Sequence, residues 1–253
     1  MKILFISLGC DKNLADSEEM LGLLTGSGHE IVDSEEEAEA IVINTCCFIH
    51  DAKEESVNTI LEMAEYKKTG KCKALVVTGC MAQRYKEEIT QEIPEVDAVL
   101  GTTSYGDIVK ALNEVQAGHV FQEFRDINEL PEDSGRRVLT TGGHFGYLKI
   151  AEGCDKHCTY CIIPSLRGSF RSVPEERLLA QAEYMASQGV KELILVAQET
   201  TVYGTDLYGR KTLHILLKKL CQIRGIRWIR VLYCYPEEIY DELIQVMKEE
   251  KKI

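Results

Sequence analysis

The sequence predicts an α/β protein, with an N-terminal doubly wound parallel sheet domain followed by a partial (β/α) barrel. Three observations predict this class. Short apolar runs alternate with segments of helical periodicity up to about residue 115. Periodicity then weakens, and beyond residue 146 the same alternation resumes for three further strands. Strands that alternate with helices are typical of a parallel sheet, because parallel neighbours need crossover connections.

Length and composition limit the possible organisation. The 253 residues suit one large domain or two ordinary ones, and 45% apolar residues can supply buried cores. We expect a first domain over 1–116, a linker over 117–146 and a second domain over 147–253. Ten cysteines without a secretion signal indicate a reducing cytoplasm, where thiols serve metals or catalysis. No stretch approaches the ~18 apolar residues of a membrane span.

The negative charge is concentrated in the first half. Residues 1–145 carry 13 Lys and Arg against 27 Asp and Glu, whereas residues 146–253 carry 16 against 14. Such a surface repels phosphate backbones, because nucleic-acid affinity depends largely on Lys and Arg that neutralise phosphates. It favours a basic protein partner. The alternative is that the charge serves solubility alone.

In the first domain, apolar runs that are too short for helices predict strands, and longer periodic segments predict helices. The expected strands are 2–8, 30–32, 40–44, 74–78 and 97–100. The expected helices run from Asn13, as a cap, to about residue 26, and then over 50–68, 82–92 and 106–115.

Three cysteines follow the ends of predicted strands. Cys10, Cys46 and Cys80 each lie two residues beyond a strand, on the edge of the sheet where open α/β folds bind ligands. Three loops brought together there would make a three-thiolate site; the alternative is that they are ordinary buried thiols. Cys47 lies one residue beyond the position that these three cysteines share, so Cys46 is the better ligand. Cys72 is expected to be a bystander.

The second domain is expected to begin with a strand over 147–151 that leads into a cysteine-rich loop, as active loops do on (β/α) barrels. Ser172 and Glu175 have the spacing of a capping box for a helix to residue 188. The remaining predicted elements are strands over 192–197 and 228–233, a core-packing helix around 213–221 and a helix over 236–250.

The loop itself contains Cys154, Cys158 and Cys161 with the spacing C-x3-C-x2-C. Structural zinc takes four ligands, whereas three thiolates on a 4Fe–4S cluster would leave one iron open for a small molecule. We interpret His157 as structural or solvent-facing. A zinc knuckle that borrows a ligand from elsewhere is the alternative.

This loop resembles the signature of the radical S-adenosylmethionine (SAM) enzymes. The resemblance implies that the open iron binds the amino and carboxylate groups of SAM and that an electron from the cluster produces a 5′-deoxyadenosyl radical. Tyr160 occupies the aromatic position expected near the adenine. The second domain is then a partial radical-SAM barrel.

Further motifs are similar to those of the radical SAM methylthiotransferases. They are Leu8-Gly9-Cys10-Asp11-Lys12-Asn13, Asn44-Thr45-Cys46 and Thr78-Gly79-Cys80. The resemblance implies that Cys10, Cys46 and Cys80 hold an auxiliary 4Fe–4S cluster involved in sulfur insertion. It also implies that Gln198 and Glu199 lie near SAM, although Asp is more usual at position 199. Longer members of the family continue through the barrel into a C-terminal TRAM domain, so we expect this chain to be truncated.

The residues after Cys10 look most like the branch that modifies ribosomal protein S twelve. We therefore expect β-methylthiolation of an aspartate in that protein or in the small ribosomal subunit. The cofactors would be two 4Fe–4S clusters and SAM, with a flavodoxin- or ferredoxin-type protein as reductant and no membrane. One alternative is a tRNA adenosine methylthiotransferase. The other is a non-catalytic electron carrier with two iron–sulfur clusters.

Overall fold

The computed structural model describes residues 1–132, 135 and 137–253; positions 133, 134 and 136 of the predicted linker lie outside the described residues. The chain divides into two compact units, which we treat separately. The first unit comprises Met1–Val138 with Cys158–Arg167, and the second comprises Leu139–His157 with Gly168–Ile253. In the part of the chain that is described, no helix combines the length and apolar character required to cross a bilayer.

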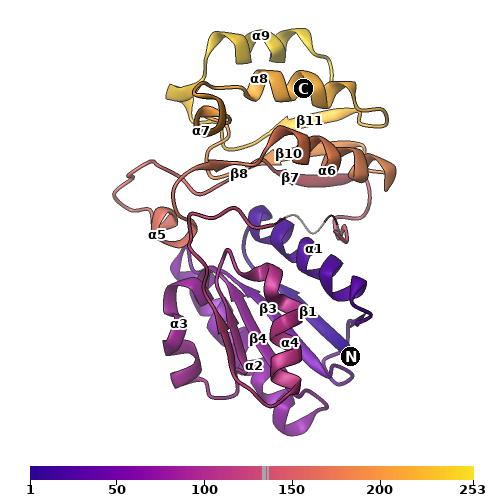
Figure 1. Ribbon diagram of the computed structural model, residues 1–253, viewed down its shortest axis with the longest axis vertical. Helices are drawn as coiled ribbons and strands as arrows, with labels where there is room; N and C mark the ends of the chain where they lie inside the picture. Colours follow the sequence, from indigo (N-terminus) through magenta and orange to yellow (C-terminus); the bar gives the residue numbers. More distant parts are fainter. Residues whose placement is uncertain (133–134, 136) are drawn as a thin grey trace. The chain divides into compact units, whose positions relative to one another are not determined.

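The first unit is built on a parallel sheet with the strand order β2-β1-β3-β4-β5-β6. Its strands are β1 (Lys2–Ser7), β2 (Glu30–Val32), β3 (Ala40–Thr45), β4 (Ala74–Gly79), β5 (Ala98–Leu100) and β6 (Phe121–Glu123). Its helices are α1 (Asp11–Gly26), α2 (His50–Thr69), α3 (Cys80–Glu92), α4 (Ile108–Gln116) and α5 (Ile163–Arg167), with a 3-10 turn η1 (Tyr105–Asp107) (Figure 1).

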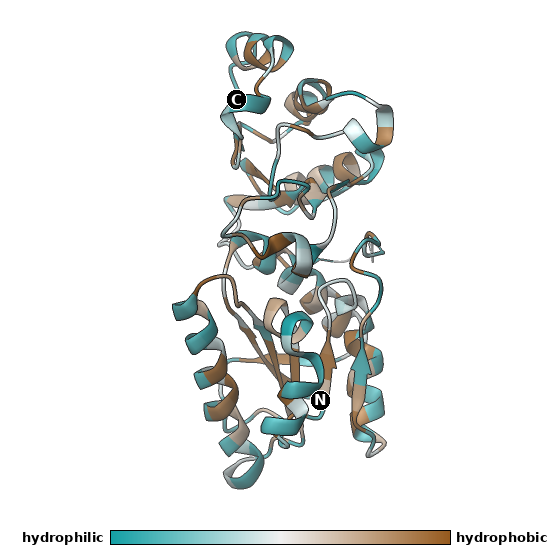
Figure 2. Cartoon of the chain, turned by 90° about the vertical axis from the view of Figure 1, so that its left-hand side faces the viewer, coloured by the Kyte–Doolittle hydropathy of each residue, from teal (hydrophilic) through white to brown (hydrophobic). Residues whose placement is uncertain are grey.

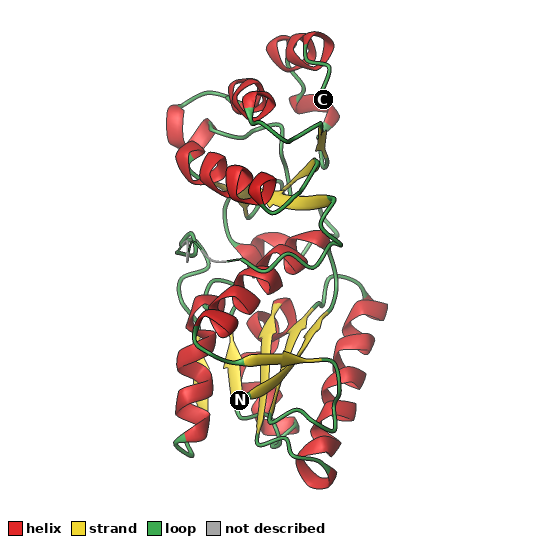
Figure 3. Ribbon diagram, turned by 90° about the vertical axis from the view of Figure 1, so that its right-hand side faces the viewer, coloured by secondary structure: helices red, strands yellow, loops and turns green. Residues whose placement is uncertain are grey.

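Helices cover both faces of this sheet. Successive strand side chains point to opposite faces, so Ile41 and Val42 of β3 belong to different apolar clusters. The cluster that contains Ile41 includes residues of α2 and α3, whereas that of Val42 includes residues of α1 and α4. Figure 3 shows helices on either side of the strands, and Figure 2 shows the apolar strands between them. The prediction of a doubly wound sheet is confirmed.

The strand order creates a switch point between β1 and β3. From β1 the chain moves outward to β2 at the edge, and then crosses to β3 on the other side of β1. Doubly wound sheets bind their ligands at the carboxyl ends of the strands where the order reverses. Cys10 and Cys46 lie in the loops that follow these two strands.

The second unit has an open parallel sheet with the order β11-β10-β7. Its strands are β7 (Phe145–Lys149), β10 (Glu192–Val196) and β11 (Trp228–Val231), with an antiparallel pair of β8 (Ala151–Glu152) and β9 (Arg171–Ser172). Its helices are α6 (Glu175–Ser187), α7 (Thr205–Tyr208), α8 (Leu213–Gln222) and α9 (Asp241–Glu249), with a 3-10 turn η2 (Pro236–Glu238). Parallel strands that alternate with helices agree with the predicted partial barrel.

Two details of the second unit correct the sequence analysis. The expected capping box does not form, because Pro174 is the N-cap of α6 and makes no side-chain cap. The Ser172 hydroxyl instead donates to Asp206 at 2.6 Å and accepts a hydrogen bond from the Gly204 N–H. The expected helix over 236–250 is split, since extended backbone at Ile239 and Tyr240 separates η2 from α9.

Candidate functional site

The loops of Cys10, Cys46 and Cys80 pack directly against one another. Cys10 is the N-cap residue of α1, Cys46 follows β3, and Cys80 is the first residue of α3. A Cβ added at Gly9 would lie 2.7 Å from the Cys46 Cβ and 3.0 Å from its Sγ. A Cβ at Gly79 would collide with the Asn44 side-chain oxygen and lie 2.6 Å from the Thr45 carbonyl oxygen. A glycine before each of two cysteines therefore permits the close approach of the three loops.

The Asn13 side chain connects the same three loops. Its Nδ2 donates to the carbonyl oxygens of Leu8 at 3.1 Å and of Thr45 at 2.9 Å, and its Oδ1 lies 3.8 Å from the Cys80 Sγ. The prediction that Asn13 caps the first helix is wrong. The helix begins at Asp11, and Asn13 is completely buried in its first turn. Since each bond reaches a different strand end, a single amide holds the loops of the cysteines together.

Cys80 is a buried thiol with a cation beside it. Burial raises the pKa of the Cys80 thiol, the Arg167 guanidinium beside it lowers that pKa, and the Cys46 and Cys10 thiols raise it. A metal reverses the penalty of burial, because it binds the thiolate and releases the proton. Among the described residues, no group of three or more His, Cys, Asp or Glu is in position to hold a metal ion. A 4Fe–4S cage distributes its cysteines over different irons, so its ligands lie further apart than those of one ion. Three thiols are the donor type that such a cage takes, and a cluster at this site stays a prediction.

Cys47 and Cys72 belong to the core of the first unit. Cys47 and Cys72 lie in the apolar cluster between the sheet and helices α2 and α3, and the Cys72 thiol donates to the Ala74 carbonyl oxygen. Burial raises the pKa of Cys47 to about 12. Cys80 lies in the same cluster, so the interpretation of Cys46 as the better ligand and Cys72 as a bystander stays a prediction.

In the second unit, the loop of Cys154 is fixed by its own backbone. The Cys154 N–H donates to the Gly168 carbonyl oxygen at 3.1 Å, and the Asp155 carboxylate accepts from the Phe170 N–H at 2.9 Å. A Cβ at Gly153 would collide with the Ser169 carbonyl oxygen. The backbone therefore holds Cys154 at one place beside the β8–β9 pair.

A cavity of about 260 Å³ opens beside Cys154. It is lined by Cys154, Asp155, Lys156, Phe170, Glu199, Val202, Thr205, Lys211 and Glu238. Glu238 bridges two lysines, because its carboxylate pairs with Lys156 and lies 2.9 Å from the Lys211 ammonium. The hydrogen bond between Lys156 and Glu238 raises the pKa of the lysine and lowers that of the glutamate. Lys156 also lies 4.3 Å from the centre of the Tyr235 ring.

The two predicted SAM contacts after β10 differ in their surroundings. Glu199 is buried and lines the cavity, and its Oε1 accepts from the N–H and hydroxyl of Thr201 and from the Tyr235 N–H at 3.4 Å. The Gln198 Oε1 is buried and has no hydrogen-bond partner within the described ranges. Glu199 thus orders its own loop, while the Gln198 acceptor is unused among the described residues.

Cys158, Tyr160 and Cys161 belong to the first unit, whereas Cys154 belongs to the second. Cys158 and Cys161 form a turn in which the Cys161 N–H donates to the Cys158 carbonyl oxygen at 3.0 Å. The Tyr160 ring is 83% exposed, and His157 is exposed as the sequence analysis predicted. A joint role of the three cysteines stays a prediction.

Sequence reasoning missed Lys156, Lys211 and Glu238. Lys156 lies inside the cysteine motif, so its position alone could have indicated that it is a residue of the site. Glu238 follows the last strand and reaches Lys156 over a separation of 82 residues, and no local pattern indicates such a contact. Only the fold brings these charges together.

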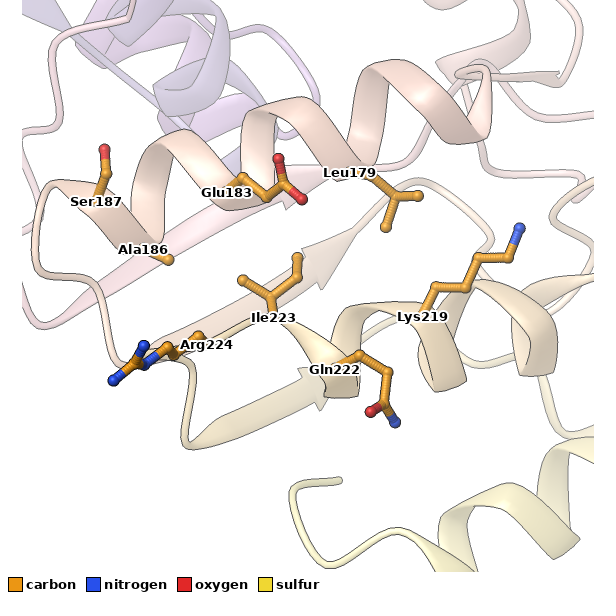
Figure 4. Close-up of a pocket in the computed structure, with 8 residues that line it drawn as sticks. All are labelled: Leu179, Glu183, Ala186, Ser187, Lys219, Gln222, Ile223 and Arg224. Atoms are coloured by element: carbon orange, nitrogen blue, oxygen red, sulfur yellow. The ribbon is translucent and has the colours of Figure 1, made fainter.

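A larger cavity of about 570 Å³ lies elsewhere in the second unit, between α6 and α8. Figure 4 shows its lining residues, which are Leu179, Glu183, Ala186, Ser187, Lys219, Gln222, Ile223 and Arg224. They include no cysteine and none of the predicted site residues. It is therefore not the candidate site.

Two known families account for most of the chain. Residues 2–101 match the uncharacterized protein family UPF0004, and residues 148–252 match the radical SAM superfamily. Solved structures of TsrM, a radical SAM methyltransferase from Kitasatospora setae, share the fold. One, with cobalamin and a [4Fe-4S] cluster bound, is 12% identical with a TM-score of 0.64, over 97% of this chain and 56% of that one. The chain is thus similar to UPF0004 proteins over residues 2–101 and to radical SAM proteins over residues 148–252.

Curated relatives give a narrower assignment. Ribosomal protein uS12 methylthiotransferase RimO of Lachnoclostridium phytofermentans is 66% identical over all 253 residues, and that of Clostridium botulinum strain Eklund 17B is 51% identical. Over its whole length the chain is similar to these two uS12 methylthiotransferases. It spans 58% and 56% of the length of these two relatives.

Proposed function

We propose that this chain is part of a transferase that adds a methylthio group to the β-carbon of an aspartate in ribosomal protein uS12. The observation that carries the proposal is the similarity of every part of the chain to proteins named for this activity, at 66% and 51% identity. The activity is proposed for the complete protein, because the chain spans little more than half of those relatives.

The similarity of residues 148–252 to the radical SAM superfamily implies a 4Fe–4S cluster and SAM. Cys154, Cys158 and Cys161 would hold that cluster, and Cys10, Cys46 and Cys80 would hold a second one. When bound, these groups supply one-electron chemistry at an unactivated carbon together with the sulfur to be inserted. The support for the second cluster is the packing of its three loops at the switch point of the sheet.

The residues around the second-unit cavity would bind and orient SAM. The Lys156–Glu238–Lys211 array offers both signs of charge for an amino acid group, and Glu199 fixes the loop after β10. The free acceptor of Gln198 suits a donor on the ligand. The exposed ring of Tyr160 is available to cover a nucleoside.

The charge distribution supports a basic protein substrate. The net charge of −14 over residues 1–145 is complementary to a ribosomal protein and unfavourable for an RNA backbone. We further propose a flavodoxin- or ferredoxin-type reductant and a reducing cytoplasm, in which ten cysteines stay available as free thiols.

The test uses the complete protein with iron and sulfide reconstituted under anaerobic conditions. It is incubated with SAM, reductant and either small ribosomal subunits or tRNA, and the products are analysed by mass spectrometry. We expect a methylthio mass on an aspartate of uS12, together with 5′-deoxyadenosine. Modification of tRNA instead would establish the adenosine branch, and absence of 5′-deoxyadenosine would favour an electron carrier.

Three cysteine variants assign the two sites. Cys154→Ala should abolish 5′-deoxyadenosine formation. Cys10→Ala should retain 5′-deoxyadenosine formation and lose methylthio transfer, because only the second site is disrupted. The matched control is Cys72→Ala, a buried thiol of the first unit outside both trios, which should retain both products.

A further inference from the structure

Arg167 is a buried cation at the end of α5, six residues after Cys161 in the sequence. Its side chain is 3% exposed. Its Nη1 donates to the Asp16 carboxylate at 2.8 Å, and its Nη2 donates to the Asn13 Oδ1 at 2.5 Å. A buried charge requires such partners, because its desolvation is costly. Both partners lie in the first turns of α1, directly after Cys10.

The same Asn13 oxygen also contacts Cys80. The Cys80 Sγ lies 3.8 Å from the Asn13 Oδ1, so the guanidinium and the thiol meet at one atom. A guanidinium has five N–H donors in a rigid plane and keeps its charge at all relevant pH values. It can therefore serve Asn13 and Asp16 and still act on a neighbouring sulfur.

We propose that Arg167 is a positioning residue that raises the reduction potential of a cluster held by Cys10, Cys46 and Cys80. The inference rests on the proposed function, which places a cluster there. Reduction adds one electron and hence one negative charge. A fixed cation in a low-dielectric site stabilises that charge. Net charge and hydrogen bonds to the sulfurs are determinants of cluster potentials, together with cluster type and solvent exposure. Asp16 opposes the effect, because its carboxylate offsets the charge of Arg167.

The two partners of this ion pair give opposite expectations. In the 253-residue chain with Cys154, Cys158 and Cys161 all replaced by Ala, the potential of the remaining cluster is followed by electron paramagnetic resonance during a redox titration. Arg167→Gln should make reduction about tenfold less favourable, a shift of about −59 mV for one electron. Asp16→Asn should shift the potential in the positive direction. Arg167→Lys, which keeps the charge, should stay close to the unsubstituted protein.

A second buried ion pair on the same helix is the matched control. Arg137 pairs with Glu18 at 2.7 Å, and both side chains are buried. Glu18 is two residues from Asp16, so it points to nearly the opposite side of α1. Arg137→Gln should destabilise the fold to a similar extent and leave the potential unchanged. A purely structural role of Arg167 would give shifts of the same sign in Arg167→Gln and Asp16→Asn, or none.

The outcomes separate the inference from the proposed function. If the unsubstituted Cys10, Cys46 and Cys80 assemble no cluster under reconstitution, the proposed function fails and the inference with it. If the cluster forms and its potential is the same in Arg167→Gln, Asp16→Asn and the parent, the inference alone is overturned. If Arg167→Gln does not fold, the sign of the shift in Asp16→Asn decides.

Discussion

Asn13 and Thr45 are joined by a 2.9 Å hydrogen bond from the Asn13 side-chain amide to the Thr45 carbonyl oxygen, across 32 residues of sequence. The acceptor directly precedes Cys46, and the donor lies three residues after Cys10. The bond therefore sets the spacing of two cysteine loops before any metal is present. Preorganisation of this kind lowers the cost of ordering ligands around a cluster.

Asn13→Ala should lower the free energy of unfolding by ~1–3 kcal/mol, because the buried Thr45 carbonyl oxygen loses its Asn13 partner. It should also reduce the iron bound after reconstitution. Urea denaturation and iron analysis measure the two effects. Asn58→Ala, at an exposed position of α2, is the control and should stay within ~0.5 kcal/mol of the parent. Equal stability of both variants would contradict the role of Asn13.

Gly79→Ala should be much more destabilising than Gly118→Ala. Both glycines have positive φ, 92° and 85°. A Cβ at Gly79 collides with the loop of Cys46, whereas among the described atoms none lies within 4 Å of a Cβ at Gly118. Backbone strain alone costs ~1–3 kcal/mol, and overpacking adds ~1–3 kcal/mol at Gly79. Chemical denaturation of both variants tests this difference. Similar losses of unfolding free energy would show that the loops of Cys46 and Cys80 can move apart to accept the added Cβ.

The stability of the second unit should depend on the ionisation of Cys221. Burial raises the pKa of its thiol from 9.0 to about 11. The folded chain thus holds the proton more tightly than the unfolded chain, so this contribution is complete below pH 9 and is lost as the pH rises toward 11. Cys221→Ala should reduce the loss of unfolding free energy between pH 9 and pH 11. The half-buried Cys234, replaced by Ala, is the control. An unchanged pH dependence in Cys221→Ala would refute the assignment.

Glu199→Ala should destabilise the chain by ~1–3 kcal/mol and weaken SAM binding. The carboxylate accepts from the Thr201 and Tyr235 N–H groups, and buried donors that lose their acceptor pay the cost of desolvation. Thermal unfolding and equilibrium dialysis with SAM measure the two effects. Glu183→Ala, at the exposed rim of the larger cavity, is the control. Unchanged SAM binding in Glu199→Ala would show that SAM does not bind in this cavity.

The strands and the edge of the sheet that carries the cysteines could be predicted from the sequence, because apolar runs and their end points are local signals. The structure agrees for β1, β3 and β4, each within a residue or two at its end. Strand order could not be predicted, since it depends on pairing between distant segments. The short strand β6 was missed within the predicted linker, because Phe121–Glu123 has too little pattern to be distinguished from a loop.

The polar residues of the site were harder to place. Asn13 and Ser172 have the residue types of helix caps, yet tertiary partners take their side chains. A preference worth ~1 kcal/mol is readily overridden by buried hydrogen bonds. The contact of Arg167 with Asp16 spans 151 positions. Such long-range pairs carry no signal in a single sequence.

The segment Cys158–Arg167 packs with the first unit, although the chain on both sides of it belongs to the second. Leu166 is 2% exposed there, and its carbonyl oxygen accepts from the Thr102 hydroxyl at 2.8 Å. A subclone that starts at residue 139 would therefore contain the segment Cys158–Arg167 without the rest of the first unit. Leu166 would be exposed to water, and the guanidinium of Arg167 would lose its contact with Asp16. No single cut in the chain therefore produces two fragments that each contain one complete unit. Biochemical work on either set of three cysteines requires the two units to be expressed as one chain.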